Sequence, residues 1–171
     1  GTPRWASSMP KQELDSLRKT NADGYSVIPG AGWAGTAAYP PSNMADFEGF
    51  LRQMFKRYKG KITAYECWNE PDTTHFKGNA EQYVEMLKTM YRVLKEEDPG
   101  AILVGGVGSG YPPWNTKIFG MGAGSSMDAL SIHPYCMLDP IDDYHKGALG
   151  QFETFVKEKE KELGHPLPVW A

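Results

Sequence analysis

Cysteine is scarce in this chain. Its 171 residues include two cysteines, Cys67 and Cys136. Two thiols make neither the disulfide framework of a small secreted domain nor a cysteine-based metal cluster. Cys67 falls in a segment that we predict to be a strand, so we expect a buried free thiol there. A chain of this length can instead build one domain around its own hydrophobic core.

The chain also lacks an excess of positive charge and any long apolar run. It has 18 Lys and Arg against 21 Asp and Glu, a net charge of −3 and a pI of about 5.8. No basic surface therefore favours a nucleic acid as partner. No apolar segment approaches the roughly 18–20 residues of a membrane span, so we expect none. The composition, 40% hydrophobic and 23% charged, is typical of a globular protein.

Short apolar segments alternate with amphipathic helices along most of the sequence. The predicted strands are residues 61–68, 101–107, 127–133 and 167–171, with a weaker candidate at Thr2–Ala6. The predicted helices are residues 43–58, 80–97 and 148–163, with a shorter one at about 10–19. We expect Asn43 and Asn79 to cap helix starts and Gly164 to end the last helix. The alternation predicts an α/β fold with a parallel sheet, as a doubly wound sheet or a barrel.

A glycine-rich stretch, residues 105–110, follows one predicted strand without forming a nucleotide-binding motif. Such a motif must open a helix whose N-terminus points at phosphate. Pro112 and Pro113 come next, and we expect no such helix after them. We interpret the glycines as a place where the chain turns off a strand end close to a ligand. The loop-like segment 21–41 is long enough to predict a functional role.

The segment Trp68-Asn69-Glu70-Pro71 places an amide and a carboxyl group side by side at a predicted strand end. In parallel α/β barrels the C-terminal ends of the strands carry the active site. A carboxylic acid there can protonate a leaving oxygen if burial or a neighbouring negative charge keeps it protonated. An adjacent Asn can bind a substrate hydroxyl. From these residues alone, a simple turn remains the alternative.

Trp68-Asn69-Glu70-Pro71 resembles the fourth-strand signature of the clan A glycoside hydrolases, which are retaining (β/α)8 barrels. Other segments resemble that clan in order: residues 2–7 its third-strand end, 50–60 the helix and turn before the signature, 97–101 the end of the fourth helix, and 128–135 the sixth strand. The pattern is most like that of glycoside hydrolase family 39, with family 5 next. The resemblance covers nearly the whole chain.

The resemblance implies a role for each matching residue. Glu70 would be the catalytic acid/base, and Asn69 would bind the sugar 2-hydroxyl. His133 and Tyr135 would line the cleft near the scissile bond. For His133 the alternative is a strand-end histidine whose hydrogen bonds are satisfied within the protein.

Aromatic and histidine side chains elsewhere allow fewer conclusions. By the resemblance, Trp5 and more loosely Trp33 and Trp114 would stack on sugar faces, with loop packing as the alternative for the last two. The remaining histidines are scattered without metal-site spacing, and we interpret them as surface residues; they are His75, His145 and His165. We therefore predict neither a metal site nor a cofactor.

A retaining glycosidase needs a second carboxylate about 5–5.5 Å from the acid/base. The family places this nucleophile at the end of the seventh strand, after a segment like residues 168–171. We therefore expect it within about three residues past Ala171. Because a full barrel takes about 250 residues, we predict strands three to seven, a single partial catalytic domain over residues 1–171. Alone, this chain would not complete a double displacement.

The fold prediction is thus α/β, a partial (β/α)8 barrel, and the implied function is hydrolysis of a β-linked glycan or glycoside. Family 39 suggests a β-xyloside, a uronic-acid-containing glycan or a bacterial exopolysaccharide as the carbohydrate partner. The usual place of polysaccharide degradation suggests a secreted or extracytoplasmic location. One alternative is a non-catalytic carbohydrate-binding barrel that lacks the nucleophile. Another is an unrelated α/β enzyme in which residues 69–71 form a turn. The oligomeric state does not follow from the sequence.

Overall fold

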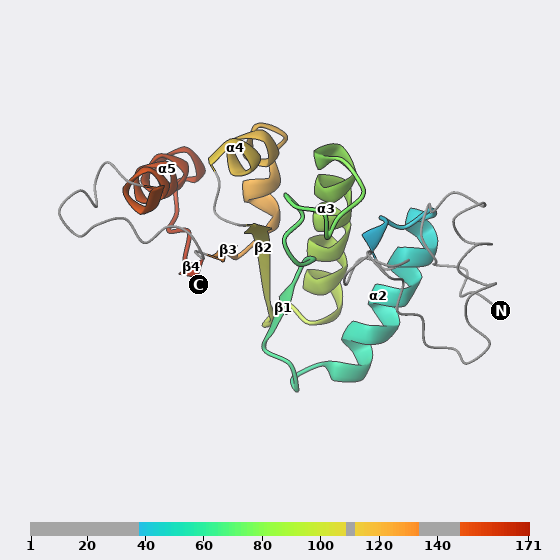
Figure 1. The fold of residues 1–171 in the computed structure, drawn as a ribbon. Coiled ribbons are helices and arrows are strands. Elements are labelled where there is room, and N and C mark those ends of the chain that lie inside the picture. Colours follow the sequence, from blue (N-terminus) through green and yellow to red (C-terminus); the bar gives the residue numbers. More distant parts are fainter. Residues whose placement is uncertain (1–37, 109–111, 134–147) are drawn as a thin grey trace.

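The computed structural model describes residues 38–108, 112–133 and 148–171 (Figure 1). The strand predicted at Thr2–Ala6 and the helix predicted at about residues 10–19 lie outside the described residues. So does most of the loop-like segment 21–41.

Four parallel strands form one sheet, and their order in the sheet is their order in the chain. They are β1 (Ala64–Glu66), β2 (Ile102–Gly108), β3 (Ala129–Ile132) and β4 (Val169–Trp170). Three of the four predicted segments in this part of the chain contain one strand each, and β2 extends one residue beyond its predicted segment 101–107. A doubly wound sheet reverses its strand order at a switch point, whereas a barrel keeps consecutive strands adjacent. The described sheet has the arrangement of a barrel.

Strand β2 lies inside this sheet and is covered on both faces. Its neighbours Leu103 and Val104 point to opposite faces, and both are at most 1% exposed. Leu103 pairs with Tyr65 of β1, and Val104 pairs with Ala129 of β3. This explains why the sequence of β2 is apolar without alternation, as in other parallel strands covered on both faces.

The helices follow one another along one side of the strands (Figure 1). They are α2 (Met44–Tyr58), α3 (Ala80–Glu97), α4 (Pro112–Gly120) and α5 (Ala148–Leu163), with a 3-10 turn η3 (Ala123–Ser126). The helices predicted at residues 43–58, 80–97 and 148–163 are confirmed. None of the helices in the described ranges is both long and apolar enough to cross a membrane.

The predicted helix caps are confirmed. The side chain of Asn43 accepts a hydrogen bond from the N–H of Ala45 at the start of α2. Asn79 and Gln82 form a reciprocal capping box at the start of α3. Gly164 follows α5 with a φ of 76°, in the left-handed region that favours glycine. Local sequence thus decides where these three helices begin or end.

Helix α4 corrects one prediction. We expected no helix after Pro112 and Pro113, but a helix begins at Pro112 itself. The first backbone N–H groups of a helix have no partner within it, so proline loses nothing there, and its φ already suits a helix. The two prolines therefore begin this helix.

The hydrophobic core lies between the sheet and the helices. Phe55 of α2 is fully buried and meets Tyr65 of β1 edge-to-face, with 4.8 Å between ring centroids. Complete burial of such a side chain stabilises the fold by roughly 1.5–3 kcal/mol. Cys67 lies in the same cluster as a free thiol, as predicted, and burial raises its pKa to about 12. It is therefore a packing residue rather than a reactive one.

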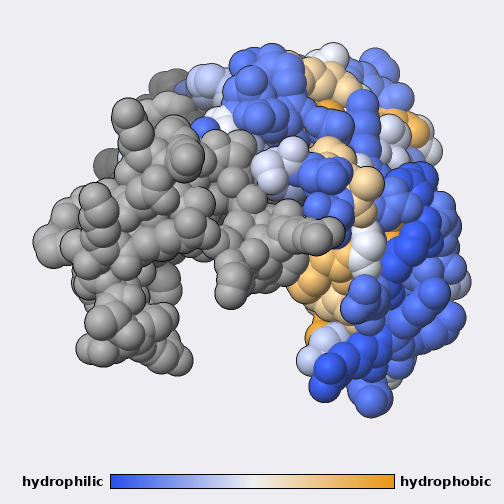
Figure 2. Space-filling view, turned by 90° about the vertical axis from the view of Figure 1, so that its right-hand side faces the viewer, coloured by the Kyte–Doolittle hydropathy of each residue, from blue (hydrophilic) through white to orange (hydrophobic). Residues whose placement is uncertain are grey.

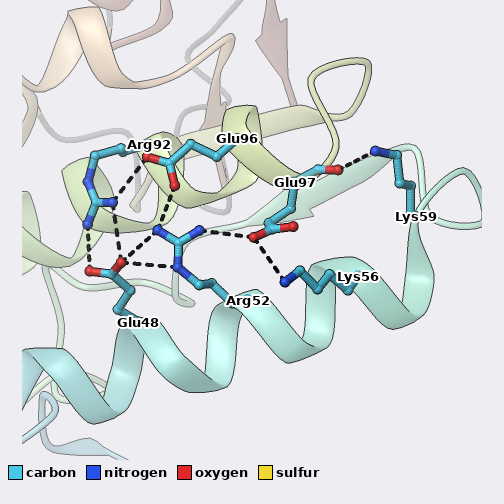
Figure 3. Close-up of polar contacts among 7 residues, drawn as sticks. All are labelled: Glu48, Arg52, Lys56, Lys59, Arg92, Glu96 and Glu97. Carbon is cyan, nitrogen blue, oxygen red and sulfur yellow. Dashed lines mark hydrogen bonds and ion pairs between the residues drawn. The ribbon is translucent and has the colours of Figure 1, made fainter.

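Charged side chains join the outer surfaces of α2 and α3 (Figure 3). Arg52 bonds Glu96 at 2.6 Å and Glu97 at 2.9 Å, and Arg92 bonds Glu48 at 2.6 Å. In Figure 2, hydrophilic residues cover most of the coloured right-hand side, and hydrophobic residues form a central band with smaller patches at the top. Because most of these charged side chains are partly exposed to water, each ion pair contributes little to stability.

Candidate active site

The chain leaves the sheet abruptly at the C-terminal end of β1. The N–H of Cys67 still donates to the carbonyl of Val104 in β2, at 2.9 Å. Trp68 then has a φ of 72° and Glu70 a φ of 46°, in the left-handed region that non-glycine residues rarely adopt. Each such residue costs on the order of 1–3 kcal/mol, and such strain clusters at functional sites. The backbone therefore marks this turn independently of the sequence motif.

The carboxylate of Glu70 lies between two imidazoles. The Nδ1 atom of His133, which follows β3, lies 2.8 Å from Oε1. The Nδ1 atom of His75 lies 3.0 Å from Oε2. Only 12% of the Glu70 side chain is exposed. Each carboxylate oxygen thus has an imidazole nitrogen of its own within hydrogen-bond distance.

The two histidines favour the ionised form of Glu70. The hydrogen bond from His133 has the largest effect and lowers the pKa of the Glu70 carboxyl. Burial opposes this shift, while the charges of both imidazoles and the His75 hydrogen bond reinforce it. The net result is a pKa below the ordinary value, so in this arrangement the carboxylate form is favoured.

A compact turn after Glu70 positions His75. The hydroxyl of Thr73 donates to the carbonyl of Glu70 at 2.9 Å and accepts from the N–H of His75 at 3.2 Å. The carbonyl of His75 accepts from the indole Nε1 of Trp68 at 3.0 Å. The Trp68 ring itself packs edge-to-face on Phe76. Trp68 therefore anchors the turn that brings His75 back to Glu70.

The interpretation of His75 as a surface histidine is wrong. Its side chain is 33% exposed, and its ring contacts Glu70. A spacing of five residues matches no regular element, so no sequence signal pointed to this contact, which depends on an irregular turn with positive φ at Trp68 and Glu70. By contrast, the structure leaves His165 exposed, as expected. His145 lies outside the described residues.

The structure brings Glu70 and His133 together. Asn69 lies beside Glu70 and is exposed. Trp114 lies on α4, where its ring packs on Tyr83 of α3 at 5.5 Å and its Nε1 is buried without a partner among the described residues. Trp114 is also partly exposed, so its stacking on a sugar face stays a prediction beside the packing alternative. The predicted cleft residues Trp5, Trp33 and Tyr135 lie outside the described residues.

The glycines of β2 lie next to this turn. Gly106 has a φ of 77°, and its N–H donates to the hydroxyl of Tyr83 at 2.8 Å. The pairing of β2 with β3 shifts register between Gly105 and Gly108. A methyl group on Gly108 would come within 3.0 Å of the Asp72 carboxyl group. Glycine at these positions therefore lets the ends of β1 and β2 approach closely.

Metal-binding chemistry has no support in the part of the chain that the structure describes. Within residues 38–108, 112–133 and 148–171, no three His, Cys, Asp or Glu side chains group so that they could hold a metal ion. The chemistry available beside Glu70 is that of a carboxylate and two imidazoles.

No protein-family model and no curated protein sequence gives a significant match to the chain. A solved family 39 glycoside hydrolase from the gut symbiont Bacteroides cellulosilyticus WH2 aligns with 95% of the chain, at 18% identity and a TM-score of 0.60. The chain therefore shares the fold of part of that enzyme's (β/α)8 barrel. The predicted fold class is therefore confirmed, and the chain spans 38% of the length of that enzyme.

Two other solved structures align with part of this chain. A glucosidase from Croceicoccus marinus is 21% identical over 54% of this chain and 23% of its own, with a TM-score of 0.45. A calcium-binding mutant of Bacteroides uniformis beta-glucuronidase 2 is 21% identical over 72% of this chain and 15% of its own, also with a TM-score of 0.45.

Proposed function

We propose that this chain supplies part of the active site of a retaining glycoside hydrolase, with Glu70 as its acid/base, acting on a β-linked glycan or glycoside. The observation that carries the proposal is the contact between Glu70 and His133. These residues are 63 positions apart and come from the ends of β1 and β3. They meet at the edge of the sheet where (β/α)8 enzymes hold their active sites. A simple turn at residues 69–71 would not require such a partner.

In the proposed reaction, Glu70 first donates its proton to the glycosidic oxygen while a second carboxylate attacks the anomeric carbon. The glycosidic bond breaks, and the leaving group departs as an alcohol. Glu70, now ionised, then takes a proton from water, and the water oxygen attacks the anomeric carbon and releases the second carboxylate. That nucleophile must lie about 5–5.5 Å from Glu70, and the proposal expects it within about three residues after Ala171.

The nucleophile would also adjust the proton affinity of Glu70. The first step needs Glu70 protonated, whereas the two imidazoles favour its ionised form. A second carboxylate within about 5.5 Å would raise the pKa of Glu70 by like-charge repulsion. When the nucleophile becomes esterified to the sugar, that repulsion ends and the imidazoles again favour the ionised base. The proposed pair would thus change protonation state in the order that the reaction needs.

Other residues complete the proposal. Asn69, exposed beside Glu70, would bind the sugar 2-hydroxyl. His133 and Tyr135 would line the cleft, with Trp5 and, more loosely, Trp33 and Trp114 as stacking surfaces for sugar rings. Because polysaccharides are degraded mostly outside the cytoplasm, we also propose an extracytoplasmic location.

The test is a set of Glu70 variants in the full-length protein that contains this chain. Glu70→Ala should lower kcat about 10²–10⁴-fold on aryl glycosides with poor leaving groups, the usual contribution of a general acid. Azide should restore turnover on activated substrates and give a β-glycosyl azide, because a small anion replaces water without needing the base. Glu158→Ala, which removes an exposed carboxylate of α5, should keep wild-type rates.

A non-catalytic carbohydrate-binding barrel is the second candidate. The observation in its favour is the lowered pKa of Glu70, since an ionised carboxylate suits hydrogen bonding to sugar hydroxyls. In that case, calorimetry would detect glycan binding that weakens in Glu70→Ala, and the wild-type protein would hydrolyse no aryl glycoside. Hydrolysis with azide rescue would exclude this candidate.

A further inference from the structure

His75 has two oxygen atoms within reach of the same ring nitrogen. Its Nδ1 atom lies 3.0 Å from Oε2 of Glu70 and 2.9 Å from Oγ1 of Thr73. The one hydroxyl proton of Thr73 is already donated to the carbonyl of Glu70. Toward His75, both the Thr73 oxygen and the ionised carboxylate can therefore only accept. It follows that Nδ1 of His75 carries a proton and shares it between the two oxygens.

We propose that His75 is a positioning residue that holds Glu70 while its carboxylate is ionised and releases it when Glu70 is protonated. This inference rests on the proposed acid/base role of Glu70. In this arrangement His75 binds Oε2 of Glu70, while His133 contacts Oε1.

The surroundings of the two histidines indicate that His75, rather than His133, can give up its hydrogen bond to Glu70. The backbone N–H of His133 is bonded to the carbonyl of Gly108, so this residue is tied to the end of β2. His75 lies in a turn outside the sheet, and its side chain is 33% exposed against 23% for His133. If Oε2 gains a proton, Nδ1–H of His75 keeps Thr73 Oγ1 as its acceptor. Release therefore leaves no unsatisfied polar group, which would otherwise cost stability.

The charged groups around Glu70 determine the direction of the pH effect. Within the described residues, His133 faces Glu70 from the end of β3 and His75 from the turn after β1. The Asp72 carboxyl group, in the same turn, lies against Gly108. Both imidazoles lower the pKa of Glu70. Removal of His75 should therefore raise this pKa and favour the acid form over the base form.

Two kinetic consequences follow, one for each step of the reaction. The alkaline limb of kcat/KM reports loss of the proton from the general acid, so His75→Ala should move this limb to higher pH. The second step needs Glu70 as an oriented, ionised base. For substrates with activated leaving groups, whose turnover is limited by this step, His75→Ala should lower kcat near neutral pH on the order of tenfold, as for loss of one charge-assisted hydrogen bond.

The experiment compares three variants of the full-length protein. His75→Ala should show both effects, and His75→Gln, which keeps an N–H donor, should return the alkaline limb and kcat toward the wild type. His165→Ala, which removes an exposed histidine, should change neither. A His75→Ala profile that superimposes on the wild type would overturn the proposal. Equal losses of kcat in His75→Ala and His75→Gln would also overturn it. They would show that the imidazole ring matters through its packing, and that an N–H donor at this position does not restore kcat.

A spectroscopic measurement separates this inference from the proposed function. Long-range ¹H–¹⁵N spectra of the imidazoles should show His75 protonated at Nδ1, with resonances that shift in Glu70→Gln. If turnover depends on Glu70 but the His75 resonances do not shift in Glu70→Gln, the inference fails and the proposed function stands. If the resonances respond but the protein hydrolyses no glycoside, the proposed function fails and the contact between the side chains stands.

Discussion

Tyr83→Phe tests how the end of β2 is held in place beside the candidate site. The hydroxyl of Tyr83 accepts the backbone N–H of Gly106 at 2.8 Å, and the whole side chain is buried. Gly106 lies just before Gly108, where the pairing with β3 has changed register. The ladder between strands therefore does not supply the partner that this N–H needs. A side chain from α3 supplies it instead.

The expected loss of stability can be worked out from these contacts. Phenylalanine keeps the ring and its packing on Phe76 and Trp114, at 6.2 and 5.5 Å between centroids. The variant thus loses no substantial apolar burial. What changes is the N–H of Gly106, which becomes a buried donor without an acceptor. Such a group costs about 1–3 kcal/mol, so we expect the free energy of unfolding to fall by about that amount.

Urea unfolding of the purified protein provides the measurement. The midpoint should fall while the m-value stays constant, since an altered m-value would mean a change in the surface exposed on unfolding. Tyr58→Phe is the matched control, because its ring is 38% exposed on α2. The free energy of unfolding of Tyr58→Phe should stay within about 0.5 kcal/mol of the wild-type value. If Tyr83→Phe also stayed within that range, the bond to Gly106 would not carry the stability assigned to it.

Two further predictions concern the helices. Asn79→Ala should lower the free energy of unfolding by about 1 kcal/mol, because the N–H of Gln82 loses its cap, whereas Asn79→Ser should stay within a few tenths in the same urea titration. Hydrogen bonds from Arg92 and then Arg52 lower the pKa of Glu48 from 4.5 to about 2, so its ion pairs stabilise the fold above pH 4.5 and cease to do so as the pH falls toward 2. The destabilisation caused by Glu48→Gln should accordingly vanish over that pH range and shrink in 1 M NaCl, and a loss independent of pH and salt would contradict this account.

The periodic segments of the fold could be predicted because they depend on local rules. Helices α2, α3 and α5 follow apolar stripes at helical spacing, and their ends follow capping residues such as Asn79 and Gly164. Helix α4 departs from the prediction, because two successive prolines indicate a break in a helix when they lie in its interior but suit its first turn.

The candidate site could be predicted in part. Glu70 and His133 follow strands that had been predicted, and parallel strands end at the same edge of a sheet, so their meeting was foreseeable. The contact between Trp114 and Tyr83 was not, because it depends on how α4 packs against α3. His75 was misjudged because its spacing resembles no regular element. Its place depends on the left-handed residues and hydrogen bonds of one irregular turn.

By itself, the sequence determined the order of strands and helices, the helix ends, and Glu70 as the residue most worth testing. Periodicity and capping act within a few residues, so they can be read from neighbours in the chain. Only the tertiary structure decided the individual contacts of Glu70: Oε1 meets the imidazole at the end of β3, and Oε2 meets a second imidazole from a folded-back turn. Those contacts lower the pKa of the carboxyl group, because hydrogen bonds and charges act through space between residues that the sequence keeps apart.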